Sequence, residues 1–155
     1  MRWIILTATH LATLAFGFAL GVYYLPILTA PPGPTKAEVE AATRSVEFKG
    51  RFERNLKGSD PIHWGEGEVM VGRSQIVHVG RLAPGPDYKL YLVKGFVDTK
   101  DGFLKVKKDA RLIADIKTFE GFIATVPSGT DIAAYDTVLV WCEAFSQFIT
   151  AAKYR

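Results

Sequence analysis

Residues 3–30 of the chain form one long, mostly apolar stretch without a charged side chain. No Asp, Glu, Lys or Arg occurs from Trp3 to Ala30; Arg2 precedes the stretch and Lys36 is the first charge after it. A helix from Trp3 to Tyr23 would span roughly 30 Å, which is about the thickness of one hydrocarbon core. The aromatic residues at its two ends suit the two membrane interfaces. The pattern therefore predicts a transmembrane helix.

A cleaved signal peptide is the alternative for the same stretch. Ala19-Leu20-Gly21 resembles a cleavage site between small residues. The apolar run, however, is longer than the core of a signal peptide and continues past that site to Leu28. We therefore expect residues 1–30 to be an uncut anchor, with residues 3–25 in the lipid bilayer. Because Arg2 favours the cytoplasmic side, we expect a single-pass protein with a cytoplasmic amino terminus and an extracytoplasmic carboxyl-terminal domain.

A proline-rich linker and a short helix are predicted for residues 31–45. Pro31-Pro32-Gly33-Pro34 must end the first helix, because proline lacks the backbone N–H and clashes with the preceding turn. Thr35, followed by Glu38 three residues later, is typical of a capping box. Apolar residues at spacings of three and four then predict an amphipathic helix over about Lys36–Ser45. We expect this helix to be a spacer; packing against the membrane or the domain is the alternative.

From residue 46 onward the pattern changes to that of β-strands. Every second residue from Val46 to Phe52 is apolar or glycine and the others are charged, a period of two that suits a half-buried strand. Pro84-Gly85-Pro86-Asp87 is a turn signal, and Lys100-Asp101-Gly102 is interpreted as a hairpin or loop tip. The further predicted strands are Glu68–Val71, Ile76–Val79, Tyr88–Val93, Phe119–Val126 and Thr137–Phe145. This spacing predicts an all-β domain over residues 46–155, a β-sandwich of jelly-roll or barrel-like form.

Composition and charge limit the classes of function. The formal net charge of the chain is +3; subtracting the single charge of the first thirty residues, Arg2, leaves about +2 for residues 31–155. That balance is not the clustered basic face of a nucleic-acid binder, so no nucleic-acid partner is expected. Cys142 is the only cysteine, which excludes a disulfide within the chain and any multi-cysteine metal site.

The most distinctive stretch runs from Tyr135 to Ser146. In an extended strand, alternate residues share a face. One face would hold Val138, Val140, Cys142 and Ala144, and the other Leu139, Trp141 and Phe145. Both faces are apolar, which predicts a central strand that is covered on both sides and a thiol among aliphatic neighbours.

At this stretch the sequence resembles the DM-thirteen domain family, also described as the electron-transfer DM domain. The family occurs alone in bacterial proteins and beside DOMON domains in animal ones. Its closing pattern is Y-x-x-V-x-I-W-C-x-x-F-S with an alanine shortly after, and the matching residues here are Tyr135, Val138, Val140, Trp141, Cys142, Phe145, Ser146 and Ala151. Earlier family features match Gly50-Arg51-Phe52, Gly67-Glu68-Val69, Gly85-Pro86-Asp87-Tyr88 and Leu90-Tyr91-Leu92. The resemblance covers about residues 48–152.

The chain departs from the family in two places. Phe148-Ile149-Thr150 stands where the family usually has a glycine, and Lys105 to Arg111 looks like a basic insertion. The resemblance implies a β-sandwich-like domain with a redox role centred on Cys142, either as a bare thiol or as a ligand to a prosthetic group. It does not name the prosthetic group.

The residues by themselves give a weaker case for a reactive thiol. A working thiol is partly exposed and electropositive, because the thiolate is the reactive form. No Lys or Arg lies between Asp131 and Ala152, and Glu143 should point to the opposite face of the strand from Cys142. A buried, inert core cysteine is therefore the alternative.

A haem would need a second ligand besides Cys142. His78 shares a strand face with Ile76 and is interpreted as a buried, hydrogen-bonded histidine. His63 falls in a predicted loop, and Asp87 is expected to fix its turn by accepting bonds from backbone N–H groups. His78, His63 and Asp87 are thus only weak candidates for cofactor contacts, and no metal site is predicted.

Two functions remain from the sequence. The first is an anchored, extracytoplasmic electron-transfer or redox accessory domain that uses Cys142 with a redox partner in the membrane or outside the cytoplasm. The second is an anchored binding or adhesion module with an inert core cysteine. No nucleophile has a recognisable base partner, so an enzyme with its own substrate is the less favoured interpretation.

Overall fold

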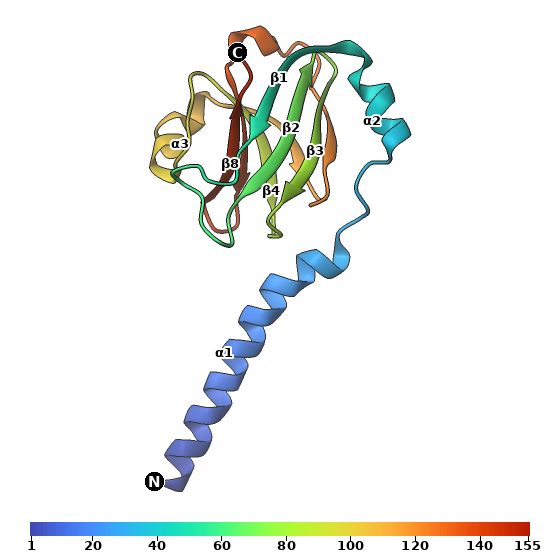
Figure 1. The fold of residues 1–155 in the computed structure, drawn as a ribbon. Helices are drawn as coiled ribbons and strands as arrows, with labels where there is room; N and C mark the ends of the chain where they lie inside the picture. Colours follow the sequence, from blue (N-terminus) through green and yellow to red (C-terminus); the bar gives the residue numbers. More distant parts are fainter.

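A single long helix, α1 (Arg2–Thr29), stands out from the rest of the molecule in the computed structural model, which describes residues 1–155 (Figure 1). None of its residues is buried. It is long and apolar enough to cross a membrane, although a signal sequence would meet the same criteria. The helix ends directly before the Pro-rich linker, as the sequence predicts, because those prolines cannot continue it.

The predicted short helix is confirmed as α2 (Lys36–Ala42) and the 3-10 turn η1 (Thr43–Ser45). Thr35 and Glu38 form the full capping box, in which each side chain bonds the backbone N–H of the other residue. The helix is more than a spacer, because Ala42 packs with Met70 and Val77 on the outer face of a sheet. α2 thus covers part of the domain (Figure 1).

The rest of the chain is a β-sandwich of two four-stranded antiparallel sheets, as predicted. The first sheet has the order β1-β2-β3-β6 and the second β5-β4-β7-β8. The strands are β1 (Val46–Phe52), β2 (Gly65–Gly72), β3 (Gln75–Leu82), β4 (Tyr88–Val93), β5 (Arg111–Ile116), β6 (Phe122–Thr125), β7 (Thr137–Cys142) and β8 (Gln147–Lys153).

The main core lies between the two sheets, where the inward side chains of both meet. A second, smaller cluster covers the outer face of β4, β7 and β8. There Phe103 of helix α3 (Lys100–Val106) packs against Trp141 and Tyr91. The central strand β7 is therefore buried on both faces, and all six of its residues are buried.

Two expectations about the elements were wrong, one at Lys100-Asp101-Gly102 and one at the end of the last predicted strand. Lys100-Asp101-Gly102 is no hairpin tip but the first turn of α3, because Thr99 caps it by accepting a bond from the Gly102 N–H. The basic stretch Lys105 to Arg111 contains the end of α3, the 3-10 turn η2 (Lys107–Asp109) and the start of β5. The last predicted strand stops at Cys142, and β8, which the sequence pattern did not separate from it, follows a turn.

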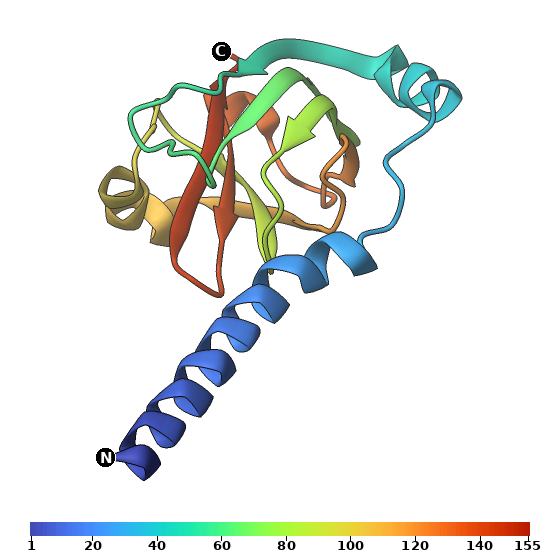
Figure 2. The same ribbon diagram turned by 60° about the horizontal axis from the view of Figure 1, so that its bottom comes forward.

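A third 3-10 turn, η3 (Ile132–Ala134), precedes β7, and Tyr154 donates a hydrogen bond from its hydroxyl to the Ile132 carbonyl oxygen (2.7 Å). This bond holds the carboxyl terminus at the end of the sandwich away from α1 (Figure 1). The opposite end of the sandwich, with the turn between β7 and β8, faces α1 (Figure 2).

Candidate functional site

Cys142 is the last residue of β7 and lies at the end of the sandwich next to α1. It pairs with Tyr88 of β4 on one side and with Gln147 of β8 on the other. The strand ends here because Ser146 adopts a left-handed backbone (φ 47°) and its N–H bonds the Glu143 carbonyl oxygen (3.2 Å). This tight turn takes Phe145 out of the strand, so that it is exposed, contrary to its predicted place beside Trp141.

The Cys142 thiol is buried, with 2% of the residue exposed. Its Sγ–H donates to the Pro86 carbonyl oxygen at 3.0 Å. Burial raises the pKa of the thiol above its usual value, and the carboxylate of Asp87 adds to the increase, while backbone N–H groups of Phe145 and Ala144 oppose it. The resting group is therefore a neutral, hydrogen-bonded thiol.

The turn over the thiol is held at several points. Tyr88 donates from its hydroxyl to the Ala83 carbonyl oxygen (2.9 Å), and the Glu143 N–H donates to the Asp87 carbonyl oxygen (3.0 Å). Gly85 is needed at its position because a Cβ there would lie 2.4 Å from the Tyr88 hydroxyl oxygen. The turn thus covers Cys142 as a fixed element.

Asp87 does not fix this turn in the way the sequence suggested. Its backbone is left-handed (φ 54°), and its carboxylate pairs with the Lys89 ammonium (2.9 Å) rather than with backbone N–H groups. Lys89 also bonds the carboxylate of Asp115 (2.8 Å), and both bonds raise the pKa of Lys89, that to Asp115 more. Asp87 therefore acts in a surface ion-pair network.

A cavity of 140 Å³ lies beside Cys142 and brings separate parts of the chain together. Its walls come from α1, from the segment before β2, from the turn before β4 and from the turn after β7. The lining residues are Ala19, Val22, Tyr23, Ile62, His63, Pro84, Gly85, Pro86, Tyr88, Cys142, Phe145 and Ile149.

His63 is the one histidine in this cavity, so the fold places two of the predicted site residues, His63 and Cys142, at the same cavity. No hydrogen bond joins them. The Nδ1 of His63 bonds the Asp60 carboxylate at 2.7 Å, which leaves Nε2 as the free ring nitrogen. The sequence placed His63 in a loop, as a weak candidate for a cofactor contact.

His78 lies elsewhere, in the main core, as the buried histidine that the sequence predicts. Its ring packs between Phe52 and Phe122, with centroids 5.0 and 5.1 Å apart. Nε2 bonds the Glu66 carbonyl oxygen at 3.0 Å and Nδ1 has no partner. Burial lowers the pKa of His78 to about 4, against the opposing effect of the Glu66 bond. At neutral pH the ring is uncharged.

A haem does not fit at Cys142 in this conformation. Cofactor pockets usually have volumes of about 300–1,000 Å³, and the cavity of 140 Å³ is smaller than that range. No group of three or more His, Cys, Asp and Glu side chains is placed to hold a metal ion. The surroundings of Cys142 therefore do not form a haem site.

Comparison with protein families decides the assignment. A family model described as Electron transfer DM13 matches residues 47–154, which is most of the chain. The chain belongs to the DM13 family. Comparison with curated proteins and with solved structures gives no match. The family description supports a role of the DM13 domain in electron transfer.

On the outer face of the DM13 domain, a polar cluster surrounds Glu143. Its carboxylate accepts bonds from the Lys107 ammonium (2.5 Å) and from the Tyr91 hydroxyl. Burial raises the pKa of Glu143, but these two partners outweigh it and the net shift is downward. Lys107 also lies 5.4 Å from the centre of the Trp141 ring. Sequence reasoning missed this cluster, because Lys107 comes from the basic stretch interpreted as an insertion.

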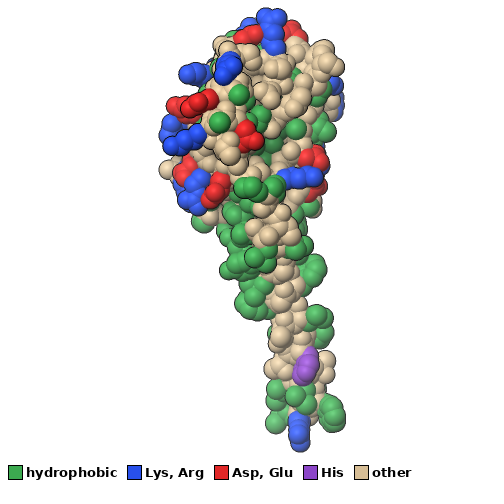
Figure 3. Space-filling model, turned by 90° about the vertical axis from the view of Figure 1, so that its right-hand side faces the viewer, with side chains coloured by type: hydrophobic (Ala, Val, Ile, Leu, Met, Phe, Trp, Pro, Cys, Tyr) green, Lys and Arg blue, Asp and Glu red, His purple; other side chains and the backbone are tan.

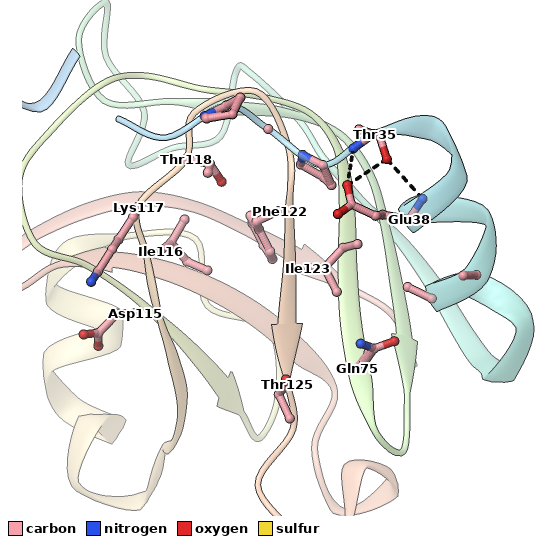
Figure 4. A pocket seen from close by; sticks show the side chains of 15 residues that line it. Thr35, Glu38, Gln75, Asp115, Ile116, Lys117, Thr118, Phe122, Ile123 and Thr125 are labelled. Carbon is pink, nitrogen blue, oxygen red and sulfur yellow. Dashed lines mark hydrogen bonds between the residues drawn. The ribbon is translucent and has the colours of Figure 1, made fainter. Parts of the chain in front are cut away.

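A larger hollow than the Cys142 cavity lies elsewhere on the molecule. It has a volume of 920 Å³ and lies between the linker, α2 and the edge of the sandwich formed by β6 and the end of β5 (Figure 4). Glu38, the acidic residue on its α2 side, is already bound to Thr35 in the capping box. Asp115 on its other side is bound to Lys89. The acidic groups at this hollow are therefore already paired, whereas Cys142 and His63 lie at the smaller cavity.

Proposed function

We propose that this chain is a single-pass membrane protein whose DM13 domain lies outside the cytoplasm and transfers electrons through the Cys142 thiol. In this proposal residues 1–30 are the anchor, residues 31–45 connect it to the domain, and residues 46–155 are the redox domain. The function is that of an accessory redox component and not of an enzyme with its own small-molecule substrate.

The anchor is supported by α1. The helix has 28 residues, a length of about 42 Å, and none of them is buried in the protein. An apolar helix of this kind is stable only in lipid or against a partner. Arg2 at its amino-terminal end supports a cytoplasmic amino terminus.

The observation that carries the redox role is the position of Cys142 on the wall of a cavity. Cys142 belongs to the main core cluster, but it also lines a space of 140 Å³ together with His63. The thiol is the only one in the chain, so its redox partner must be another molecule. The turn that contains Pro86 covers the thiol and separates it from such a partner.

The proposed chemistry is thiol–disulfide exchange with a disulfide supplied by that partner. The Cys142 thiol loses its proton, its sulfur attacks one sulfur of the partner disulfide, and the other sulfur leaves as a thiolate. One S–S bond forms and one breaks; Cys142 is oxidised and the leaving sulfur is reduced. His63 Nε2 is the nearby candidate to accept the proton, because Asp60 holds the Nδ1 side of the ring.

The test measures the rate at which the Cys142 thiol reacts in the full chain, purified in detergent. A small aromatic disulfide is added to the native protein, and the release of its coloured thiolate is followed at several pH values. Cys142→Ala is the blank, and Cys142→Ser keeps a donor for the Pro86 carbonyl without a sulfur. We expect native Cys142 to form the mixed disulfide faster than the protein unfolds, and His63→Ala to slow the reaction near neutral pH.

A second function is favoured by the burial of the thiol and its bond to Pro86. In that alternative Cys142 only joins β7 to the turn before β4, and the DM13 domain binds a partner without redox chemistry. It predicts that native Cys142 reacts no faster than global unfolding, and that Cys142→Ala leaves the activity of the protein in cells unchanged. Those two results together would replace the redox proposal.

The location is tested separately from the chemistry. A membrane-impermeant amine reagent is applied to intact cells and to inverted membrane vesicles. We expect the lysines of the DM13 domain to be modified from outside the cell and protected in inverted vesicles. Modification in inverted vesicles alone would place the domain in the cytoplasm and contradict the proposed topology.

A further inference from the structure

The end of the sandwich next to α1 carries apolar side chains that the domain leaves uncovered. Ile62 and Phe145 are each 57% exposed. Both belong to the wall of the Cys142 cavity, where they meet Ala19 and Val22 of α1. On the face drawn in Figure 3, hydrophobic side chains gather where the domain meets the helix, and the charged side chains of the domain lie above them.

The length of α1 sets the depth of these side chains. With Trp3 at the cytoplasmic interface, a rise of about 1.5 Å per residue places Ala19 about 24 Å and Val22 about 29 Å further along the helix. The hydrocarbon core is about 30 Å thick. The cavity that joins Phe145 and Ile62 to these α1 residues therefore lies level with the outer boundary of the hydrocarbon.

Polar and aromatic residues of the domain lie beside the next part of the chain. Trp64 and Arg81 share a pocket with Ile27 and Ala30. Lys117 lines another pocket with Leu25, Pro26 and Thr29. From Ala19 towards Ala30, the domain residues beside the chain are first apolar and then tryptophan and basic residues. A bilayer has the same order of preferred side chains from its core to its headgroups.

The linker keeps the domain close to this level. Gly33 lies against the Glu120 carbonyl oxygen so closely that a Cβ on Gly33 would be only 2.0 Å away. The four Cα–Cα steps from Thr29 to Gly33 span at most about 14 Å. The domain therefore cannot move far above the membrane while this contact is intact.

We propose that the end of the DM13 domain around Ile62 and Phe145 docks on the phospholipid bilayer, with these two side chains inserted at the outer boundary of the hydrocarbon. The proposal rests on the membrane anchoring proposed above, and not on the redox role of Cys142. The mouth of the Cys142 cavity then lies at the bilayer surface, and a partner must reach the thiol there.

The test uses the full chain with Cys142→Ala, reconstituted in phosphatidylcholine vesicles. Single spin labels are attached through Ile62→Cys, Phe145→Cys, Phe96→Cys and Leu14→Cys. Phe96 is the matched control, because it is 47% exposed and lies at the opposite end of the sandwich, beyond the Val93–Thr137 pair. Leu14, in the middle of α1, reports the anchor itself. Collision rates with oxygen, which concentrates in lipid, and with a water-soluble nickel chelate are measured by electron paramagnetic resonance.

Docking predicts a ratio of oxygen to nickel collisions at positions 62 and 145 that is several-fold higher than at position 96. Ratios at 62 and 145 equal to that at 96 would overturn the docking, and a lipid-like ratio at Leu14 would then leave the anchor in place. A water-like ratio at Leu14 would overturn the anchor and the docking together. Circular dichroism of each labelled protein, matched to the parent, shows that the label has not unfolded the domain.

Discussion

Lowering the pH from 7 to 5 should destabilise the DM13 domain through His78. The folded pKa of His78 is lowered to about 4 from its ordinary value of 6.5, first of all by burial. Between these two values the unfolded chain binds a proton at this residue and the folded chain does not. The contribution of the neutral His78 to the free energy of unfolding is therefore fully present above pH 6.5 and is lost as the pH decreases toward 4.

The size of the effect follows from the same two values. Linkage gives a loss of about 2 kcal/mol in the free energy of unfolding between pH 7 and pH 5, and about 3 kcal/mol once both states are protonated. A positive charge on the ring is unfavourable in the folded protein, because Phe52 and Phe122 enclose the ring and Nδ1 has no hydrogen-bond partner.

The assay is urea unfolding of the full chain in detergent, followed by tryptophan fluorescence at pH 7 and pH 5. His78→Gln is the control, because its amide can donate to the Glu66 carbonyl oxygen but does not titrate in this range. The parent should lose about 2 kcal/mol more than His78→Gln between the two pH values. Equal losses in both proteins would refute the burial of a neutral His78 as the cause.

Three further predictions concern the thiol and the anchor. Cys142→Ser should be more stable than Cys142→Ala by about 1 kcal/mol in urea unfolding, because serine can still donate to the Pro86 carbonyl oxygen; the reverse order would contradict that bond. Gly85→Ala should speed the reaction of Cys142 with a small disulfide, since the new Cβ must displace the Tyr88 hydroxyl; an unchanged rate would mean that the turn does not control access. Amino-terminal sequencing of the membrane-extracted protein should begin at Met1 or Arg2, and a chain that begins near Val22 would identify a cleaved signal peptide.

The sequence alone was sufficient for the elements that have a regular period. The uncharged stretch before Lys36 predicted α1, the spacing of Thr35 and Glu38 predicted the cap of α2, and alternation after Val46 predicted the sandwich. These features depend on neighbours close in the chain, and local sequence carries their signal. Both faces of β7 are apolar, which also predicted its central position, because a strand is apolar on both faces when both are covered.

Local signals failed where two of them competed. Lys100-Asp101-Gly102 contains the residues of a turn, but the Thr99 cap and the apolar surface of Tyr91 and Trp141 stabilise a helix there. The break after Cys142 depends on the left-handed backbone of Ser146, a residue with only a weak preference for that conformation. The residues from Thr137 to Phe145 therefore suggested one longer strand.

The surroundings of Cys142 were decided only by tertiary structure. Its sequence neighbours gave a buried aliphatic site, whereas the cavity, His63 and the contact with α1 come from segments that the fold brings to one end of the sandwich. In the same way, Lys107 comes from a distant turn and pairs with Glu143. The sequence around Cys142 contains no basic residue, but the folded structure places one beside that strand. The sequence pattern predicts which residues are buried, because burial follows local periodicity. Which side chains meet at a site depends on how distant strands and loops pair, and the local pattern does not contain that information.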